Sequence, residues 1–538
     1  MGNAPEPQAS DSSRRIWRQL TSPPVPQGDG ISTIPVAIVG AGPVGLAMAI
    51  DLAQRGHQVV VLGKFDFVPA GSKAICFSKR SLDILDRLGV GAASVEKGVT
   101  WNVGKVFWKA SRDPIYQFDM LPVKNQKMPG FINLQQYHLE DLLLERASHL
   151  PNIDFRPGHE LVGLQRDAGS NLLTVRRGAE SYAVRANWLI ACDGYRSFVR
   201  EAMDLDFEGR VFEDNFLIAD IRMDAEQAPE RWFWFDPPFN PGKSALMHKQ
   251  PDGVWRLDFQ LGWGIDRKAA AQPENVETYV RAMLGDQVKF EEEWYSVYTF
   301  QCRRMRKFVH DHVIFAGDSA HLVSPFGARG CNGGLADVDN LGWKLDLILR
   351  GEADITLLDS YDHEAVVTAD ANIEASSRST DFLTPKSAAS TIFRDAVLEL
   401  ASEVPFARQL VNSGRLSVAI PYPDSALNTP DVDDWACLGI APGTVAVDAP
   451  LGTGFLLEQL GDGFTLLTDG KMAVPAGAQN LEIPAEATVL RDRYGLQAGS
   501  AYLIRPDQYV AARWKSPDEG AVQAAILRAK GYIGEAEN

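Results

Sequence analysis

A carboxylate stands between two glycine-rich turns in the stretch FAGDSAHLVSPFGARGCNGG, residues 315–334. The apolar run that leads into it predicts a buried strand, and Asp318 follows the carboxyl end of that strand. Pro325 and Gly330 then lead into a helix that we expect to begin near Asn332. A carboxylate can accept hydrogen bonds from a polyol, and a helix N-terminus stabilises negative charge. The stretch therefore suits a sugar chain joined to an electron-rich ring.

A second glycine-rich turn lies far upstream. Gly40, Gly42 and Gly45 fit the spacing G-x-G-x-x-G between an apolar run at 34–39, which predicts a strand, and a predicted helix at 45–56. The first glycine makes the tight turn, the second lets the backbone approach a diphosphate, and the third lets helix and strand pack closely. The helix N-terminus adds free N–H groups, so the turn predicts a dinucleotide site.

One element of this fingerprint is missing. Gly63 stands where an Asp or Glu at the end of the second strand would bind the ribose hydroxyls. Either Asp66 substitutes from the next turn, or the ribose is held by water and backbone. A turn with a purely structural role, and no nucleotide, stays an alternative at this point.

The two helix starts suit the two ends of one long molecule. A diphosphate would bind at the glycine turn at 40–45, whereas a ribityl chain joined to an isoalloxazine ring would bind at the carboxylate and helix start near residue 318. The sequence therefore predicts FAD as the cofactor.

A third motif, D-G-x-x-S-x-V-R at residues 193–200, follows another predicted buried strand. Alone, Asp-Gly is usually only a turn. Together with G-x-G-x-x-G and with G-D-S-A-H…P-x-G-A-x-G-x-N at residues 317–332, it resembles the class A flavoprotein aromatic hydroxylases. These are single-component FAD monooxygenases, and the phenol hydroxylase and 3-(3-hydroxyphenyl)propionate hydroxylase branches are the nearest in pattern. The resemblance covers residues from about 34 to about 385.

The resemblance implies cofactor contacts along the whole length of FAD. It assigns the diphosphate to Gly40, Gly42 and Gly45, and the ribityl chain to Asp318 beside Gly317. Asp193 would support FAD and the region that meets the reduced nicotinamide. Pro325 would lie by the substrate and the flavin, and the backbone of Gly330, Cys331 and Asn332 would contact the N1–O2 edge of the flavin. Lys73 falls where relatives often carry an FAD-contacting arginine, and Gln136 matches a glutamine near the flavin. A solvated lysine and a helix-capping glutamine are the alternatives.

The resemblance also implies a reaction. NADH or NADPH reduces the flavin, O2 adds to give a C4a-hydroperoxide, and an activated phenolic or related aromatic ring attacks the distal oxygen. A same-fold enzyme that performs epoxidation, Baeyer–Villiger or decarboxylative oxidation of a polyketide or antibiotic is the alternative. A flavin-binding regulatory protein without turnover is a second one.

The catalytic base is not identified by the sequence. His248, Tyr295, Tyr298 and Asp258 lie in the expected substrate domain, but for each one alone a sheet surface or a satisfied core position is the simpler interpretation. No arginine that would clamp a substrate carboxylate can be singled out. The aromatic residues at 232–235, with Trp255, Phe259 and Trp263, fit either the lining of a flat pocket or a sheet core, and the density of Trp favours the pocket.

The predicted fold class is α/β, with a Rossmann-like FAD-binding domain interleaved with a mostly antiparallel β-sheet substrate domain. The stretch LRDRYGLQAGSAYLIRPDQYVAARW resembles the C-terminal extension of the phenol hydroxylase branch, which implies a C-terminal thioredoxin-like domain. The expected parts are a flexible arm at 1–30, the FAD-binding domain within 31–385 (about 31–100, 130–210 and 300–385), the substrate domain (about 100–130 and 211–300), a helical and proline-rich connection at 386–435, and the C-terminal domain at 436–538 without C-x-x-C. Lacking that motif, the last domain is expected to serve packing or dimerisation.

Composition narrows the partners. The 538 residues carry a net charge of −17, which argues against nucleic acid or an anionic membrane as a main partner. The five cysteines lack metal-ligand spacing, which fits reduced thiols in the cytoplasm and no metal site. The uncharged stretch at 34–50 is explained by strand, turn and helix rather than a membrane span. The partners that the resemblance implies are a small aromatic substrate, O2 and, for the C-terminal domain, a second copy of the chain.

Overall fold

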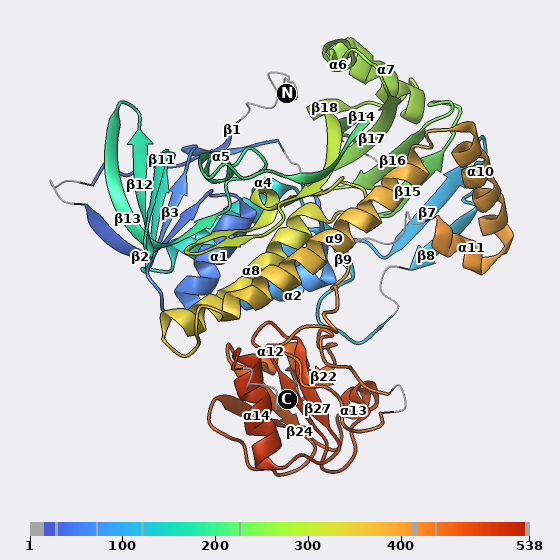
Figure 1. The fold of residues 1–538 in the computed structure, drawn as a ribbon. Coiled ribbons are helices and arrows are strands. Elements are labelled where there is room, and N and C mark those ends of the chain that lie inside the picture. The colour runs from blue at the N-terminus through green and yellow to red at the C-terminus, as the bar shows by residue number, and fades with distance from the viewer. Residues whose placement is uncertain are drawn as a thin grey trace.

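The computed structural model describes residues 16–26, 31–71, 74–119, 123–224, 228–411, 417–435 and 438–532. Two eight-stranded sheets lie side by side, with long helices running beneath and between them, and a smaller body that holds the C-terminus hangs below (Figure 1). The fold is mixed α/β.

The first sheet carries the glycine turn. Its strands, in spatial order, are β10 (Ile153–Pro157), β3 (Val59–Gly63), β2 (Ser32–Val39), β13 (Glu180–Ala191), β12 (Ser170–Arg177) and β11 (Glu160–Asp167), and β20 (Val313–Phe315) joins β13 and pairs with β19 (Val309–His310). The pairs β10–β3, β3–β2, β2–β13 and β13–β20 are parallel. Since β2, β13 and β20 run in one direction, their carboxyl ends meet at one edge, where the three motifs follow.

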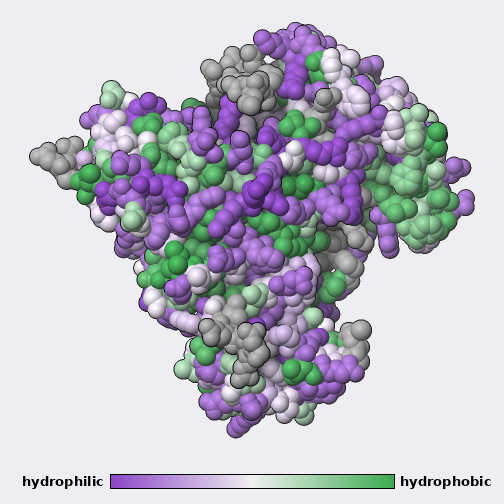
Figure 2. Space-filling view, viewed as in Figure 1, coloured by the Kyte–Doolittle hydropathy of each residue, from purple (hydrophilic) through white to green (hydrophobic). Residues whose placement is uncertain are grey.

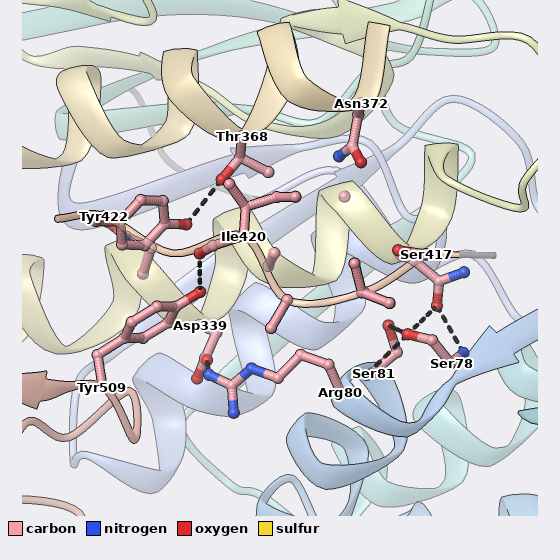
Figure 3. A pocket seen from close by; sticks show the side chains of 16 residues that line it. Ser78, Arg80, Ser81, Asp339, Thr368, Asn372, Ser417, Ile420, Tyr422 and Tyr509 are labelled. Atoms are coloured by element: carbon pink, nitrogen blue, oxygen red, sulfur yellow. Dashed lines mark hydrogen bonds and ion pairs between the residues drawn. The ribbon is translucent and has the colours of Figure 1, made fainter. Parts of the chain in front are cut away.

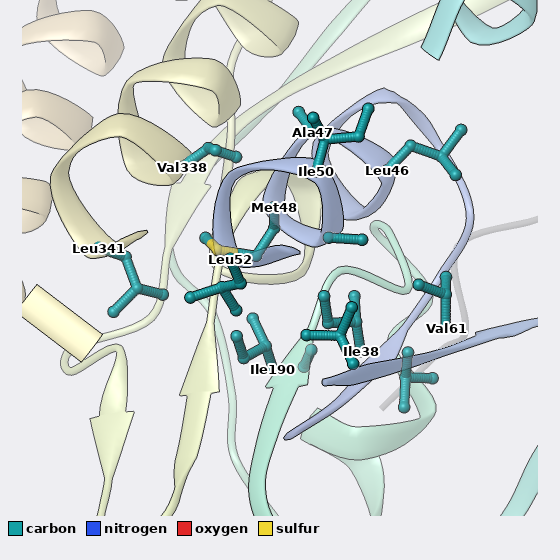
Figure 4. Close-up of a cluster of buried hydrophobic side chains, with 14 of the residues drawn as sticks. Ile38, Leu46, Ala47, Met48, Ile50, Leu52, Val61, Ile190, Val338 and Leu341 are labelled. Atoms are coloured by element: carbon teal, nitrogen blue, oxygen red, sulfur yellow. The ribbon is translucent and has the colours of Figure 1, made fainter. Parts of the chain in front are cut away.

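Helix α1 (Pro43–Gln54) is buried between this sheet and helix α8 (Gly330–Leu349). Pro43 occupies the first turn, where its missing N–H costs nothing. Figure 4 shows the resulting core, which holds side chains of α1 between those of the strands and those of α8; it labels Ile38, Leu46, Ala47, Met48, Ile50, Leu52, Val61, Ile190, Val338 and Leu341. An apolar surface on all sides is what the central position of α1 requires.

Helices α1 and α8 approach each other closely at their C-terminal halves. A Cβ at Gly342 of α8 would overlap the carboxylate of Asp51 on α1, so a larger residue there would have to displace that side chain. Asp51 accepts a hydrogen bond from Arg55 Nε at 2.9 Å, and Asp346 of α8 lies 2.7 Å from His57 Nε2. These polar contacts fix the pair where the apolar core ends.

Local structure differs from what the sequence pattern suggests at two places. The apolar spacing over 74–90 alone predicts one helix, but the stretch contains strand β5 (Cys76–Ser78), which pairs with β9 (Phe131–Asn133), before helix α2 (Lys79–Arg87) begins. The apolar spacing of α2 extends backwards into a strand that is also buried, which the 3.6-residue period cannot separate.

The arm predicted at 1–30 is also not loose throughout. Strand β1 (Ile16–Gln19) pairs with β4 (Phe67–Pro69), and the Trp17 ring lies 4.3 Å from that of Tyr137. Arg18 pairs with Asp141 at 3.1 Å. Residues 1–15 and 27–30 lie outside the described residues.

The second sheet is antiparallel except for one pair. Its strands, in spatial order, are β21 (His321–Leu322), β18 (Glu291–Arg304), β14 (Glu208–Arg222), β17 (Val254–Gly262), β16 (Ser244–Lys249), β15 (Arg231–Phe235), β7 (Val103–Trp108) and β8 (Tyr116–Asp119), of which β15 and β7 are parallel. Helix α7 (Pro273–Leu284) packs on one face through Val276 and Val280. The other face turns partly towards the first sheet and partly towards helices α9 (Leu357–Leu383), α10 (Ala388–Glu403) and α11 (Pro405–Leu410).

The smaller elements connect the two sheets. They are strand β6 (Val99–Thr100), helices α3 (Gly91–Lys97), α4 (Gln136–Ser148), α5 (Phe198–Ala202) and α6 (Arg267–Ala270), and a short 3-10 turn at Gly317–Ser319. Strands β5, β9 and β6 form a three-stranded sheet, so the chain between the two large sheets is itself ordered by pairing.

The C-terminal body has its own sheet. Its strands, in spatial order, are β25 (Ala478–Glu482), β24 (Phe464–Thr468), β26 (Ala501–Ile504) and β27 (Val510–Trp514), accompanied by β22 (Pro450–Leu451), β23 (Gly454–Phe455), α12 (Leu456–Gln459), α13 (Thr488–Tyr494) and α14 (Glu519–Ala529). Strand β25 is parallel to β24, whereas the β24–β26 and β26–β27 pairs are antiparallel.

A buried ion cluster joins this body to the rest of the molecule. Arg505 of the C-terminal body makes two hydrogen bonds to Glu364 of α9, at 2.7 and 2.9 Å, and also pairs with Asp507. Lys344 of α8 donates to the same Glu364 at 2.8 Å, and all four side chains are fully buried. Burial lowers the pKa of Lys344 to about 8. Burial alone would raise the pKa of Glu364, but Arg505 and Lys344 lower it overall.

Removal of Arg505 should destabilise the protein strongly. The substitution Arg505→Met leaves the Glu364 and Asp507 carboxylates buried without their guanidinium, and breaking a buried pair in this way costs about 3–5 kcal/mol. The control Arg378→Met removes an exposed pair with Glu374 and should cost less than about 1 kcal/mol. Thermal and urea unfolding measure both. Equal unfolding midpoints for the two variants would contradict the assignment.

Candidate active site

A cavity of about 2170 Å³ lies where the carboxyl edge of the first sheet meets the second sheet. Ligand pockets usually measure about 300–1,000 Å³, so this one has room for a long cofactor together with a second molecule. The glycine turn at 40–42 lines one end, the segment 328–332 lines another, and strands of the second sheet form the remaining wall.

Two glycines of the turn lie against other protein atoms, and the third faces open space. Gly40 has a φ of +108°, and a Cβ there would overlap the carbonyl of Cys192. A Cβ on Gly45 would overlap the carbonyl of Gly40, so this glycine lies behind the turn. Gly42, the N-cap of α1, has no heavy atom within 4 Å of its Cβ position, and it faces the cavity. Open space beside a helix start that no side chain caps fits a diphosphate.

The residues at the edge of the sheet beside this turn show which carboxylate lies near the position of the missing Asp or Glu. Gly63 ends β3 and lines the cavity, as does Lys64, but Asp66 does not. The carboxylate that does line the cavity there is Glu160, whose Oε1 lies 2.9 Å from Lys64 Nζ. Asp66 is therefore not on the cavity wall where the fingerprint acid would be, and Glu160, which is, pairs with Lys64 and Arg176.

The motif at 193–200 forms a capped turn after β13. Asp193 Oδ2 accepts a hydrogen bond from the Val199 amide at 3.2 Å, and the Ser197 side chain caps α5 by accepting from the Arg200 amide at 3.0 Å. Arg200 donates to the carbonyls of Ser319 and Tyr195, at 3.0 and 2.8 Å. The motif thus ties the β13 loop to the turn that contains Asp318.

One carboxylate oxygen of Asp193 is left without a protein partner. This atom, Oδ1, is buried and accepts no hydrogen bond from any of the described residues. Burial raises the pKa of Asp193, which is the cost of placing this carboxyl away from water. A cofactor hydroxyl at this point would satisfy the free oxygen, so the side chain fits the role predicted from the resemblance.

The turn after β20 is held from behind by α8. Asp337 Oδ2 accepts a hydrogen bond from the Gly317 amide at 2.8 Å and lies 2.7 Å from His321 Nε2. Burial alone would lower the pKa of His321, but Asp337 raises it overall. Gly317 is buried by these contacts, whereas Asp318 is exposed and lines the cavity. The carboxylate predicted for the ribityl chain is therefore the one that the cavity presents.

The start of α8 points its first turn at the cavity. The helix begins at Gly330 rather than near Asn332, and no side chain caps it at Arg329. The amides of Gly330, Cys331 and Asn332 have no acceptor within the helix, because the first turn of any α-helix leaves them free. All three residues line the cavity. The predicted backbone contacts to a flavin edge are therefore sterically available.

The Asn332 side chain has a structural role. Its Oδ1 accepts from the Ser78 amide at 3.0 Å, and its Nδ2 donates to the Cys76 carbonyl at 2.9 Å, which fastens the start of α8 to β5. Behind it lies a small polar cavity of about 20 Å³, shown in Figure 3, with room for about one water molecule. The segment at 417–422 closes this cavity, and Tyr509 and Thr368 hold that segment through Ile420 and Tyr422.

The remaining predicted cofactor residues have different outcomes. Pro325 is exposed and lines the cavity. Gln136, the first residue of α4, also lines it; its Oε1 accepts from the Ala74 amide at 3.1 Å and its Nε2 donates to Glu140 at 2.8 Å. Lys73 lies outside the described residues.

The structure therefore brings most of the predicted cofactor residues to one cavity. Those that line it are Gly40, Gly42, Gln136, Asp193, Asp318, Pro325, Gly330, Cys331 and Asn332, while Gly45 and Gly317 pack behind the two turns. Their contacts with a bound cofactor stay predictions.

The aromatic residues of the second sheet form core more than pocket. Trp232, Trp234, Trp255 and Phe259 pack together on the face that α7 covers, and none of them lines the cavity. Phe233 and Phe235 belong to the core beneath α10, and Trp263 is exposed. The interpretation as a pocket lining, which the density of Trp favoured, was wrong. Successive residues of a strand point to opposite faces, and these Trp residues share the outer one, away from the cavity.

The four titratable residues considered for catalysis separate in the same way. Tyr295 lies on the face covered by α7, whereas His248, Asp258 and Tyr298 line the cavity. Burial raises the pKa of Tyr298 to about 12, so its hydroxyl stays protonated. The interpretation of each as sheet surface or ordinary core stays a prediction, since three of the four line the cavity while His248 and Asp258 are also buried within the sheet.

Two negative findings apply to the described residues alone. In that part of the chain, no group of three or more His, Cys, Asp or Glu side chains is placed to hold a metal ion. None of the helices formed by those residues is long and apolar enough to cross a bilayer.

The parallel strand–helix–strand unit with its open glycine turn, and the second helix start at the same cavity, define an α/β protein built for FAD. Comparison with known proteins agrees. The family model described as an FAD binding domain matches residues 33–376. The 3-(3-hydroxy-phenyl)propionate/3-hydroxycinnamic acid hydroxylase of Escherichia coli (strain K12) is 30% identical over 378 residues. That match spans 69% of this chain and 66% of the relative, just under two thirds of the relative's length.

Solved structures share the fold over a longer stretch. The flavin-dependent monooxygenase PieE, in complex with FAD and substrate, has a TM-score of 0.77 at 21% identity and covers 94% of this chain and 100% of its own. Aklavinone-11 hydroxylase, in a ternary complex with FAD and aklavinone, has a TM-score of 0.74 at 21% identity and covers 93% and 100%. This chain belongs to the family that the FAD binding domain model describes.

Gly42→Ala should weaken FAD binding without unfolding the protein. A Cβ there meets no protein atom within 4 Å and the backbone is extended, so the added methyl enters only the space assigned to the diphosphate. We expect at least about a tenfold rise in the FAD dissociation constant, or about 1.4 kcal/mol, with an unchanged melting temperature of the apoprotein.

The control for this variant is Gly463→Ala in the C-terminal body, where a Cβ also meets nothing within 4 Å. It should change neither quantity. FAD titration followed by flavin fluorescence measures the affinities. Wild-type affinity in Gly42→Ala would contradict the placement of the diphosphate.

His248 should make the protein sensitive to mild acid. Burial, helped by the charge of Arg231, lowers the pKa of His248 to about 4, although Asp258 opposes the shift. The unfolded chain takes up this proton below a pH of about 6.5, so the free energy of unfolding falls as the pH drops from about 6.5 towards 4. His248→Asn should therefore lose less stability than wild type between about pH 7 and about pH 5 in urea unfolding. Parallel losses would show that His248 does not carry this dependence.

Proposed function

We propose that the protein is an FAD-dependent monooxygenase that hydroxylates a phenolic or related aromatic compound with NADH or NADPH and O2. The single observation that carries the proposal is the cavity that joins the α1 start, Asp193, Asp318 and the α8 start to a polar wall of the second sheet. When bound, FAD supplies the redox chemistry, accepting reducing equivalents from the nicotinamide and activating O2. The similarity to a hydroxylase from Escherichia coli supports this reaction class.

The residues of this chain supply position and electrostatics. The free amides at 330–332 lie at a positive helix end, where they would stabilise negative charge on a flavin ring. Asp318 and Asp193 would accept hydrogen bonds from hydroxyls of the cofactor. The Asp337–Gly317 bond holds the Asp318 turn in place before any ligand arrives, so ligand binding does not cost the free energy of ordering this turn.

Oxidation of a larger, polycyclic substrate is a second candidate. Two similar structures are named for a substrate complex and for aklavinone, and the cavity of about 2170 Å³ would hold a molecule of several fused rings beside FAD. Epoxidation, Baeyer–Villiger or decarboxylative oxidation of a polyketide or antibiotic would use the same cofactor site.

Three further assignments belong to the proposal. The C-terminal sheet, with one parallel and two antiparallel pairs and no C-x-x-C, supports a thioredoxin-like domain without a redox role. An apolar stripe over α10 and α11, green at the right of Figure 2, supports a homodimer; its exposed residues are Ile392, Phe393, Leu400, Phe406 and Leu410. The scattered cysteines support a cytoplasmic location. For the domain division, we propose the boundaries that the sequence predicts.

The test is substrate-stimulated oxidation of NADH and NADPH by the purified holoenzyme across phenols, phenolic acids and polycyclic phenols. Hydroxylation predicts a product that gains one oxygen atom, and the label from ¹⁸O2, without loss of carbon. Loss of carbon or ring insertion would favour the second candidate. Nicotinamide oxidation that no aromatic compound stimulates would contradict both and favour a flavin protein without turnover.

A further inference from the structure

A row of polar side chains crosses the second sheet on its cavity side. Arg231 of β15 lies opposite His248 of β16, His248 opposite Arg256 of β17, Arg256 opposite Asp220 of β14, and Asp220 opposite Trp294 of β18. Residues directly opposite one another on paired strands point to the same face. Four of the five, all but Asp220, line the cavity.

Every member of this row is withdrawn from solvent. The exposed fraction is 4% for Arg231, 1% for His248, 2% for Arg256, 4% for Asp220 and 5% for Trp294. Buried polar groups normally have hydrogen-bond partners, and buried charges normally have a counter-ion. The partners of each member therefore show whether the row is complete without a ligand.

Arg256 is fully matched by protein. Its Nε and Nη2 donate to the two oxygens of Asp220 at 2.7 and 2.6 Å, the bidentate geometry of a strong pair. Asp258, two residues along β17, places its Oδ2 3.5 Å from His248 Nε2. These two carboxylates are thus engaged by Arg256 and by His248.

Arg231 is not matched in this way. Its Nη1 donates to the thiol sulfur of Cys76 at 3.4 Å, a weak and neutral acceptor. Its Nε has no acceptor among the described residues, and in that part of the chain no carboxylate lies within 4.0 Å of its guanidinium. Trp294 Nε1 also makes no hydrogen bond to a described residue. His248 Nε2 makes none that meets hydrogen-bond geometry either, but it has the Asp258 carboxylate 3.5 Å away.

A single residue, Cys76, connects the row to the start of α8. Asn332, in the first turn of α8, donates to the Cys76 carbonyl at 2.9 Å, and the Cys76 thiol is the atom that Arg231 contacts. The same sulfur lies 4.0 Å from His248 Nδ1. A molecule that rests against Arg231 and His248 is therefore beside the position that the proposed function gives to the flavin ring.

We infer that Arg231 binds an oxyanion of the aromatic substrate, with His248 and Trp294 beside it, and so selects acidic over neutral substrates. The inference rests on the proposed function for the position of the flavin, but the binding step itself does not need turnover. The oxyanion has two sources, a carboxylate on a side chain of the ring or an ionised ring hydroxyl. Both offer the acceptor lone pairs and the negative charge that the guanidinium lacks.

A purely structural Arg231 is the competing explanation. A structural arginine is expected to be paired like Arg256, since removing a guanidinium from water without a counter-ion costs several kcal/mol. Arg231 instead faces a cavity large enough for a ligand. Packing of its guanidinium 5.2 Å from the Phe233 ring stabilises the side chain but does not neutralise it.

The test measures binding to the FAD-loaded enzyme by the change in flavin absorbance, with four probes. These are 3-(3-hydroxyphenyl)propionate, its methyl ester, 3-phenylpropionate and 3-phenylpropionamide, which separate the ring hydroxyl from the carboxylate. For wild type, we expect the acid to bind at least about tenfold more tightly than the amide, which lacks both groups. Loss of one charge-assisted contact corresponds to about 10- to 100-fold in affinity.

Arg231→Met should abolish this preference, and Arg231→Lys should restore part of it, because a point charge replaces the fork. If the variant weakens 3-phenylpropionate but not the ester, the oxyanion is a carboxylate; the reverse identifies the ring hydroxyl. The control Arg394→Met removes another buried arginine, on α10 and outside the cavity lining, and should leave all four affinities unchanged.

The outcomes separate this inference from the proposed function. Equal affinity of wild type for acid and amide, or equal weakening of all probes in Arg231→Met with normal FAD content, overturns the inference. Arg231-dependent binding of an acid without any hydroxylated product leaves the inference standing and counts against the proposed function. If Arg231→Met fails to fold, Arg231→Lys and the wild-type acid-to-amide ratio still decide, since a ratio near one contradicts an oxyanion site.

Discussion

The close packing of α1 against α8 is the constraint on which the rest of the site depends. Gly342 lets the two helices meet at the Asp51 carboxylate, and the apolar core between them fixes their rotation. Both helices therefore start at the same edge of the first sheet, and each brings an uncapped first turn to one cavity. Because helix N-termini carry partial positive charge, the cavity has an electrostatic preference for a molecule that is electron-rich at two separate points.

The second sheet contributes a polar surface to the same cavity. Its outer face is aromatic core under α7, whereas its inner face carries the polar row from Arg231 to Trp294. Asn332 and Cys76 connect the two halves of the site, since one side chain fastens α8 to β5 and the other touches Arg231. The cofactor region and the substrate region are thus joined by short, direct contacts, and the geometry of one constrains the other.

The glycine turn, the Asp318 turn and the buried strands that lead into them could be predicted from the sequence, because each depends on local spacing. The polar row could not. In VWRLDFQLG, Arg256, Asp258 and Gln260 alternate with apolar residues, a pattern typical of a strand with one wet face, yet nearly the whole strand is buried. Which residue faces Arg231 depends on the register between strands far apart in the sequence, which periodicity within one strand does not contain.

The central claim is that one FAD molecule spans the two helix starts, and a crystal structure of the protein grown with FAD tests it most directly. The account predicts continuous density from a diphosphate at Gly42 to a ring against the amides at 330–332, with Asp193 and Asp318 contacting the chain between them. Density for a nucleotide confined to the α1 end, with the α8 start covered by protein side chains, would contradict it.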